Sequence, residues 1–364
     1  MHVTNSSMSC FKTCRRKFFY SYILGWKPSV DKAPLRIGSA VHEGIDMLAK
    51  GMDLDDALKS VAHMYDLEIR DCDIQDLDEY NATIKAMKYE RITAVCLVTG
   101  YHRAWQDSEI RILQSEAHFD LPIVNPATNT QIRVARQAGV RDRVGLLPDG
   151  RVALMETKTV GEDISPESSY RNVLAINQQV SMYLNAAIQE GIDTVTTIYD
   201  CVRKPTIRPN RVAQTDSEGL PIVLDADLKR VLKKDGTPRK TGDKAKGYEL
   251  QYRDMTESEW YDKLMQYILG NPEEYYQRFE VARTQDELQE FKFELYEIAQ
   301  DIHACKTSGR WYKNTSACRK WNSTCPYFGL CSKQLSSESC PQGFVEVENV
   351  HQEIKELQDV SNDA

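Results

Sequence analysis

The chain has 364 residues, of which 41% are hydrophobic and 27% are charged, and its formal net charge at pH 7 is -8. This composition is ordinary for a soluble globular protein with one large or two small domains. No apolar run approaches a membrane span, the first residues lack a secretion signal, and the acidic balance excludes a positive field over the whole molecule. Ten cysteines in a chain that looks intracellular favour thiolate chemistry over disulfides.

The first informative segment combines an apolar stripe with a cationic cluster. Phe11, Phe18 and Tyr22 have the spacing of one helix face, and Cys14 stands directly before the cations. An amphipathic helix with a charged surface is the commoner interpretation of such a segment, and the cations are also candidates for contacting DNA. The cationic cluster consists of Arg15, Arg16 and Lys17.

The motif Gly-Ser-Ala-Val-His-Glu-Gly at residues 38–44 predicts the start of a helix, with His42 in an early turn. A single histidine is more often structural than a ligand, and both interpretations stay open at this point. Residues from about 45 to 105 have apolar positions spaced by three or four and are predicted to be helical. Glu116 then opens a strand-like run, either as a solvated strand residue or as an additional acid of a site.

A β-hairpin with a Pro-Asp-Gly turn is predicted between residues 139 and 159. Strand alternation puts Glu156 and Lys158 on one face, and the turn folds Asp142 back beside them. Two carboxylates and a lysine that converge in this way can hold a hard divalent cation next to a phosphate. A half-buried hairpin with a salt-bridged surface would show the same pattern.

Residues 170–188 are predicted to form a helix on which Gln179 and Tyr183 lie one turn apart, on the same face. A solvent-facing polar stripe is the alternative to a site role for this pair. A strand-like run at residues 196–202 follows, and it leads into Arg203 and Lys204, which are further candidates for contacting DNA.

Residues 229–246 are rich in lysine and arginine, with interspersed glycine and proline, and they are predicted to form a mobile basic loop. A solvated surface loop and a phosphate-contacting segment agree equally well with this composition. A capping box at Thr256 predicts a helix that runs to Ile268, and a second helix is predicted over roughly residues 285–303.

Three cysteines lie close together in a turn-rich aromatic segment near the C-terminus, a pattern typical of an iron-sulfur or zinc site. Such a site needs a fourth ligand, and Cys340 is the nearest one in the sequence. Inert buried thiols are the alternative, but these usually occur in apolar elements. The tail after Phe344 is acidic and polar and is predicted to be disordered or weakly helical. The three cysteines are Cys318, Cys325 and Cys331.

These motifs, in this order, resemble the RecB-like branch of the PD-(D/E)XK nuclease superfamily. Similar proteins are the nuclease domain of AddB, the CRISPR-adaptation exonucleases and the stand-alone exonucleases of bacteriophages. The resemblance rests on the G-x-x-x-H that ends at His42, on Asp142 followed by the Glu-Thr-Lys of residues 156–158, and on the Q-x-x-x-Y of Gln179 and Tyr183. It implies an α/β fold with a restriction-endonuclease-like core, in which helices flank a central mixed sheet.

The resemblance also implies the layout of the chain. One nuclease domain is expected over residues 1–343, followed by an acidic tail at residues 344–364. The segments expected within the domain are a helical insertion at about 45–105, the nuclease core at about 110–205, the basic loop at about 229–246, and a helical and cysteine-rich segment at about 256–343 that packs against the N-terminus.

The roles of the site residues follow from the same resemblance. One or two Mg²⁺ or Mn²⁺ ions would be held by His42, Asp142 and Glu156. Lys158 would stabilise charge on the phosphate, Gln179 would position water or phosphate, and Tyr183 would border the strand. One departure from the family pattern is Arg141, because an apolar residue usually precedes the first acid. This departure bears on how the strand packs.

An iron-sulfur cluster is a further implication of the resemblance, since Cys14 corresponds to its N-terminal ligand. A [4Fe-4S] cluster is expected, with Zn²⁺ as the alternative occupant and Cys10 or Cys340 as the alternative fourth ligand. The expected ligands are Cys14, Cys318, Cys325 and Cys331.

The implied function is a metal-dependent DNA exonuclease of phage or bacterial recombination, repair or processing, in the cytoplasm of a bacterial or phage-infected cell. Its partners would be single-stranded DNA or duplex ends, and a recombinase, a helicase or a single-strand-binding protein; a homo-oligomer is also compatible. The alternatives are a catalytically silent DNA-binding or assembly subunit, and a zinc-stapled scaffold unrelated to nucleases. The intact set of acids and lysine argues against the silent subunit.

Overall fold

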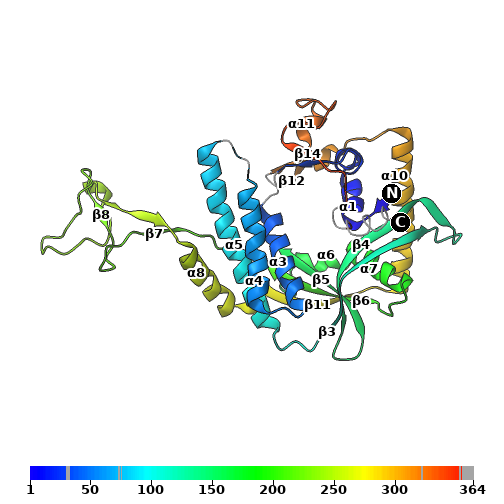
Figure 1. The fold of residues 1–364 in the computed structure, drawn as a ribbon, viewed down its shortest axis with the longest axis horizontal. Helices are drawn as coiled ribbons and strands as arrows, with labels where there is room; N and C mark the ends of the chain where they lie inside the picture. Colours follow the sequence, from blue (N-terminus) through cyan, green and yellow to red (C-terminus); the bar gives the residue numbers. More distant parts are fainter. Residues whose placement is uncertain (30–32, 73, 75, 321–322, 352–353, 355–364) are drawn as a thin grey trace.

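The computed structural model describes residues 1–29, 33–72, 74, 76–320, 323–351 and 354. A central mixed sheet is flanked by helices, as the resemblance implies, and a long arm extends away from it on the far side of three helices (Figure 1). Within these residues, no helix is both long enough and apolar enough to cross a membrane.

The sheet is organised around one long strand, β4. Strand β3 pairs with β4 in antiparallel orientation along most of its length. The other edge of β4 is shared, because β1 pairs with Arg136 and Gln137 whereas β5 pairs with the segment from Arg143 to Leu146. Residues 138–142 therefore lie in a gap between two partner strands. The strands are β1 (His2–Val3), β3 (Arg111–Val124), β4 (Gln131–Leu146), β5 (Val152–Val160), β6 (Thr196–Arg203) and β11 (Tyr276–Ala282).

The predicted hairpin is confirmed as β4 and β5, which pair from Arg143 with Met155 to Leu146 with Val152. The connecting turn places Gly150 at a φ of 87°, a conformation that glycine adopts without steric cost. Strand β5 continues parallel to β6, and β6 is antiparallel to β11. The edge strands β1 and β11 were not predicted from the sequence.

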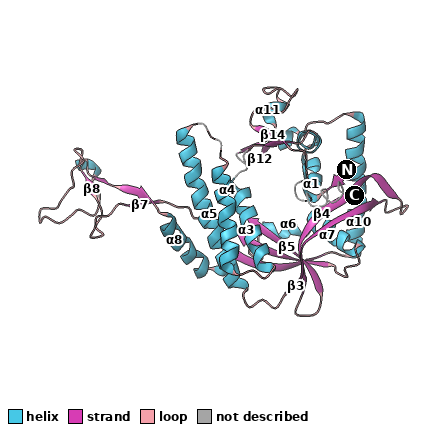
Figure 2. Ribbon diagram, viewed as in Figure 1, coloured by secondary structure: helices cyan, strands magenta, loops and turns pink. Residues whose placement is uncertain are grey.

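Helices cover both faces of this sheet, and Figure 2 shows three of them, α3 (Ala33–Ala49), α4 (Leu54–Arg70) and α5 (Leu77–Trp105), beside the strands. Tyr101 of α5 bonds to Asp200 on one face, and Gln179 of α7 (Gln178–Gln189) bonds to Glu156 on the other. The helical prediction for residues 45–105 is thus confirmed. It corresponds to α3 (Ala33–Ala49), α4 (Leu54–Arg70) and α5 (Leu77–Trp105), and α8 (Glu257–Gly270) packs against α5.

Several predicted helix boundaries are wrong. Helix α3 begins at Ala33, so His42 lies in its middle and not in an early turn. The single helix predicted for residues 170–188 is two helices, because the Asn177 side chain accepts the amide of Gln179 and starts a new helix there. The last predicted helix extends to Ser308. The helices concerned are α6 (Ser169–Leu174), α7 (Gln178–Gln189) and α10 (Gln285–Ser308).

The N-terminal helical segment is broken at Cys14, whose φ of -164° and ψ of 114° are extended. The predicted stripe forms all the same, since Phe18 contacts the rings of both Phe11 and Tyr22. The pieces are α1 (Asn5–Thr13), α2 (Arg15–Phe18) and a π-helix at Phe19–Ile23.

The cysteine-rich segment packs against this N-terminal region. The amide of Arg16 donates to Tyr312 O at 3.1 Å, and the Tyr327 hydroxyl donates to Trp26 O at 2.8 Å. The tail prediction is wrong for its first residues, because Phe344 begins a strand and packs on Tyr327. Most of the tail beyond residue 351 lies outside the described residues. The short elements here are β2 (Trp26–Pro28), β12 (Arg319–Lys320), β13 (Ser323–Thr324), α11 (Phe328–Cys331) and β14 (Phe344–Glu346).

Residues 211–254 form the arm seen at the left of Figure 1. Two antiparallel strand pairs and a series of tight turns build it, so the predicted basic loop at 229–246 is the outer part of a larger β structure. The strands are β7 (Arg211–Ala213), β8 (Val223–Leu224), β9 (Glu249–Leu250) and β10 (Tyr252–Asp254).

Candidate active site and cysteine-lined cavity

The pairing between the two strands of the hairpin stops just before Asp142 and Glu156. The ladder between β4 and β5 ends at Arg143 and Met155, and beyond it side chains hold the backbone of Thr157. The Thr157 amide donates to Asp142 Oδ2 at 2.7 Å, and the Thr157 carbonyl accepts from His42 Nε2 at 2.7 Å. Asp142 and His42 thus replace strand pairing and line the opening.

The hydrogen bond of His42 fixes its ring. Because Nε2 carries the proton given to the Thr157 carbonyl, the lone pair of the neutral ring is on Nδ1, which lies 3.9 Å from Asp142 Oδ2. Metal-binding histidines commonly donate their second ring N–H to a backbone carbonyl in this way. The nitrogen available to a ligand therefore faces the acid.

Glu156 is the most constrained acid of the site. One of its oxygens, Oε1, accepts from Lys158 Nζ at 2.5 Å and from Gln179 Nε2 at 2.7 Å. Its side chain is 5% exposed. Burial, and then the nearby charge of Asp142, raise the pKa of Glu156 to about 7. Two acids that repel each other in a buried place provide a site for a cation.

Lys158 stays protonated in this arrangement. Burial acts to lower its pKa, but the charges of Glu156 and Asp142 outweigh burial, and the pKa is raised. The Lys158 side chain remains 32% exposed, so its ammonium reaches the opening. A charged ammonium suits electrostatic stabilisation of a phosphate rather than proton abstraction.

A buried ionic network supports the opposite face of the sheet. Asp200 is fully buried and accepts from Arg143 at 3.0 Å, Arg278 at 3.1 Å and Tyr101 at 2.5 Å. Burial acts to raise the pKa of Asp200, but the two guanidinium groups reverse this, and the pKa is lowered. Arg143 also bonds to the Thr157 hydroxyl. The network therefore holds the side chain of Thr157, whose backbone Asp142 and His42 hold. The network was not predicted from the sequence.

A cleft of about 720 Å³ surrounds these groups. Its walls come from α3, from the start of α1, from the hairpin and from α7. Tyr183 lines it and packs edge-on against Phe119. The predicted site residues that line the cleft are His42, Asp142, Glu156, Lys158, Gln179, Tyr183 and Lys204.

Glu116 also lines this cleft, but it is paired. Its carboxylate and that of Asp46 each lie 2.6 Å from Lys50 Nζ. Burial raises the pKa of Asp46. Asp46 was not predicted, although its place one turn after His42 on α3 was a signal that could have found it.

Arg141, the departure from the family pattern, is buried, and its side chain contacts Glu190 and Phe119. Its Nη1 lies 2.5 Å from Glu190 Oε2, and its guanidinium lies over the Phe119 ring at 5.3 Å. The positive charge of Arg141 is thus paired with the carboxylate of Glu190, at the C-terminal end of α7.

The predicted DNA-contacting cations are dispersed. Arg15 pairs with Asp301 at 2.5 Å, and Arg16 Nε donates to Trp311 O at 2.7 Å, so both join the N-terminal region to the C-terminal region. Lys204 lines the cleft, where burial lowers its pKa. Arg203 ends β6 beside it, and Lys17 lies by the cysteines.

Four cysteines line a second cavity, of about 410 Å³. All ten cysteines are free thiols in the structure. Cys14 accepts the Asn314 amide at 3.4 Å, which places the two ends of the chain together. Cys10 and Cys340, both described, do not line this cavity, and burial raises the pKa of Cys10 to about 11. The four lining cysteines are Cys14, Cys318, Cys325 and Cys331.

The described residues contain no group of three or more His, Cys, Asp and Glu side chains arranged to hold a metal ion. The cysteines instead surround open space, with Lys17 and Lys313 among the lining residues. Four thiols around one open space are a donor set that an iron-sulfur cluster or a zinc ion can use.

The comparisons with known proteins agree with this geometry. The family model of the PD-(D/E)XK nuclease superfamily matches residues 2–332. No curated protein matches the sequence. The match spans nearly all the elements that build the cleft and the cavity, and the chain belongs to the PD-(D/E)XK nuclease superfamily.

Proposed function

We propose that the chain is a Mg²⁺- or Mn²⁺-dependent deoxyribonuclease that digests DNA from its ends. The observation that carries the proposal is the arrangement around Thr157. His42 and Asp142 both bond to this residue, and they present a free imidazole nitrogen and a carboxylate to the cleft that holds Glu156. Nitrogen and carboxylate donors beside a lysine are the groups that phosphodiester hydrolysis with a divalent ion requires.

The side chains divide the work as follows. His42, Asp142 and Glu156 would hold the ion, which supplies Lewis-acid polarisation of the phosphate and a more acidic water when it is bound. Lys158 would stabilise the charge that builds on the phosphate. Gln179 holds Glu156 in place from α7 and is suited to position water or phosphate beside it.

End-directed digestion and a role in DNA recombination, repair or processing follow from the resemblance to RecB-like exonucleases. On this proposal the substrate is single-stranded DNA or a duplex end in the cytoplasm of a bacterial or phage-infected cell. A recombinase, a helicase or a single-strand-binding protein is the kind of partner that would deliver it.

A [4Fe-4S] cluster is proposed for the second cavity. The support is that Cys14 and the three C-terminal cysteines line one open space while the closest alternatives, Cys10 and Cys340, do not. Such a cluster would join the two ends of the described chain and stabilise the fold rather than take part in cleavage. Anaerobic purification tests it: a brown protein with iron and sulfide supports the cluster, and a colourless protein with zinc contradicts it.

The nuclease proposal is tested with end-labelled single-stranded and duplex DNA, in Mg²⁺, Mn²⁺ or EDTA. We expect metal-dependent release of the label by the wild type, and no detectable release by Glu156→Ala or Lys158→Ala. Glu167→Gln is a matched control, because Glu167 is exposed and outside the cleft.

Equal digestion by wild type and both cleft variants would overturn the assignment of the site. An absence of cleavage on every substrate, with intact DNA binding, would favour the catalytically silent subunit. Release of internal fragments before end nucleotides would make the enzyme an endonuclease.

A further inference from the structure

The arm is held in a fixed direction at its base. Arg253 donates to both carboxylate oxygens of Glu259, at 2.6 Å each, and Glu259 lies in the first turn of α8. Lys85 of α5 pairs with Asp254, and Lys263 of α8 bonds to Asn210 at 2.8 Å. Since α5 and α8 share a buried core, these contacts anchor the arm to the body of the protein.

The outer arm keeps its shape through turns that its acids close. Asp216 accepts the amides of Glu218 and Leu220, and Asp225 and Asp235 each accept the amide two residues further on. Asp216 also binds Arg230. These carboxylates therefore hold the turns in shape, and that of Asp216 is also paired with a cation.

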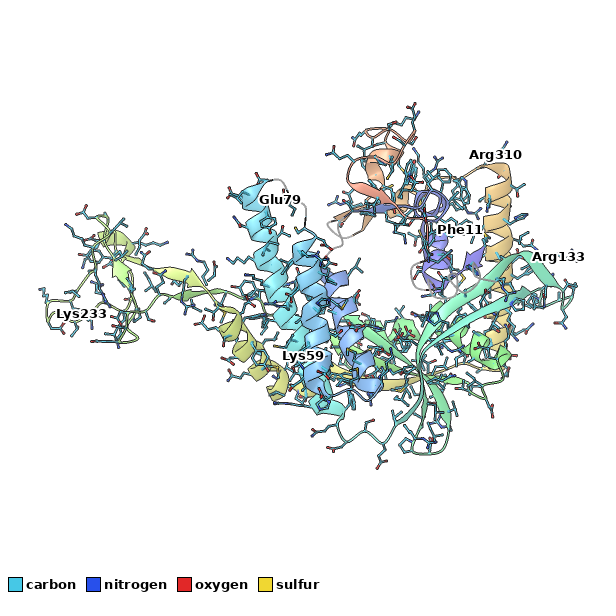
Figure 3. All side chains as sticks on the ribbon, viewed as in Figure 1. Phe11, Lys59, Glu79, Arg133, Lys233 and Arg310 are labelled. Atoms are coloured by element: carbon cyan, nitrogen blue, oxygen red, sulfur yellow. The ribbon has the colours of Figure 1, made fainter. Side chains whose placement is uncertain are left out.

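The cations of the outer arm are distributed differently. Residues 229–246 contain eight lysines and arginines and two aspartates, in a chain whose net charge is -8. Figure 3 shows Lys233 at the far end of the arm, remote from the sheet. Four exposed lysines have no ion pair within the described part of the chain: Lys233, Lys234, Lys240 and Lys244.

We propose that the outer arm binds the phosphate backbone of DNA outside the cleft, and so keeps hold of the part of the substrate that is not being cut. This inference rests on the proposed nuclease function. Exposed lysines that lack protein partners gain most from phosphate, because their contact releases counterions from the DNA. Contacts of this kind hold and orient DNA without reading its sequence.

A DNA backbone fits this surface better than a protein partner does. Interfaces between proteins are depleted in lysine and are centred on aromatic or apolar residues. Tyr248, the only aromatic residue of 229–248, is half-buried under Arg239, 5.3 Å from its ring centroid. Leu232 is exposed among the lysines, but the other exposed residues between them are small, polar or charged, which leaves the ammonium groups accessible.

The reach of the arm sets the substrate lengths for a test. About 12 residues separate Arg211 from Val223, and at about 3.3 Å per strand residue they extend at most about 40 Å. This corresponds to roughly 12 base pairs at about 3.4 Å each. A substrate of about 8 nucleotides is shorter than this span, whereas a substrate of about 40 is several times longer.

The test compares Lys233→Gln/Lys234→Gln with Lys292→Gln/Lys306→Gln, a pair of the same charge change on α10. Fluorescence anisotropy in EDTA measures the affinity for long and short DNA, single-stranded and duplex, between about 50 and 200 mM salt. For long DNA we expect the arm variant to bind about tenfold more weakly, with the slope of log affinity against log salt reduced by about 2 for duplex and somewhat less for single strands.

The short substrates and the control pair should show no change, and a quadruple variant that adds Lys240→Gln and Lys244→Gln should roughly double the change in slope. The form of long DNA that loses more affinity identifies the form the arm holds. Unchanged affinity and slope for long DNA in the arm variants would overturn the inference, as would a change in oligomeric state by light scattering without a change in DNA affinity. Because binding is measured without metal, failure of the nuclease proposal would show separately, as absent cleavage with the arm effect intact.

Discussion

The cleft and the arm are both charged, but they are built in opposite ways. In the cleft, Glu156 holds two partners on one oxygen, and Asp142 and His42 are fixed by the backbone of Thr157. In the outer arm, the lysines are exposed and the acids close turns. The hydrogen-bonded side chains of the cleft have one geometry, which hydrolysis needs. The exposed lysines of the arm can adapt to a flexible polymer such as DNA. Changes in the cleft should therefore affect stability and metal affinity, and changes in the arm should affect DNA affinity alone.

The largest effect is expected from Asp200→Ala, which leaves Arg143 and Arg278 buried without their shared partner. The free energy of unfolding should fall by about 3 to 5 kcal/mol, since a buried charge that loses its counter-charge is strongly unfavourable. Urea unfolding followed by circular dichroism measures it. The arm variant Lys233→Gln/Lys234→Gln should change this free energy by less than about 0.5 kcal/mol. Similar losses in both variants would remove the contrast between the bonded charges of the sheet and the free charges of the arm.

The second effect concerns pH and the metal-free protein. With its pKa raised to about 7 by burial and by Asp142, folded Glu156 keeps a proton that the unfolded chain releases near its ordinary value of 4.5. The free energy of unfolding should therefore fall as pH rises from about 4.5 to 7, by at most about 3 kcal/mol. Lys158, whose pKa is raised, remains protonated over this range and adds nothing to the slope.

Unfolding in EDTA at a series of pH values measures this slope, and Glu156→Gln is the control that should remove it. Added Mg²⁺ should restore stability most strongly above pH 7, because the ion competes with the proton for the carboxylate. Parallel curves for the wild type and Glu156→Gln would show that this carboxylate does not carry the effect.

A smaller effect is expected for His42→Ala, which removes the nitrogen that faces Asp142. The apparent affinity for Mn²⁺ should fall about 10- to 100-fold, with a loss of maximal rate that is smaller than for Glu156→Ala. A Mn²⁺ titration of single-turnover cleavage gives both quantities. His63→Ala, an exposed histidine on α4, is the matched control. An unchanged Mn²⁺ midpoint would exclude His42 as a ligand.

The smallest effect is expected at the base of the arm. Arg253→Gln breaks the paired contact with Glu259, a partly exposed ion pair that contributes less than about 1 kcal/mol. Affinity for long DNA should fall only about threefold, because the lysines remain and only their direction is loosened. The same anisotropy assay detects it, with Arg70→Gln, another exposed arginine in an ion pair, as the control.

The sequence predicted the parts of the fold that depend on local signals. The hairpin was predictable from strand alternation and a Pro-Asp-Gly turn, and the helical block of residues 45–105 from its apolar spacing. The pairing of His2 with Arg136 joins residues far apart in the chain, and a two-residue strand has no periodicity of its own. For the same reason β11 escaped prediction, since its partner β6 lies more than 70 residues earlier.

The sequence indicated candidate residues for the site but not their arrangement. Motif order indicated His42, Asp142 and Glu156, yet the bonds of His42 and Asp142 to the Thr157 backbone depend on where the hairpin stops pairing. Arg141 was noted as unusual, and only the packed structure shows its partner at the end of α7, Glu190.

The bonds around Thr157 also make this residue a reporter. Its amide proton is held by a carboxylate oxygen of the site and not by the neighbouring strand. Exchange of that proton with solvent deuterium therefore depends on whether Asp142 keeps its place, and it should accelerate when the acid is neutralised or replaced. The exchange rate of this one amide, followed by nuclear magnetic resonance, thus reports whether Asp142 is in place in a protein that is neither cutting nor binding DNA.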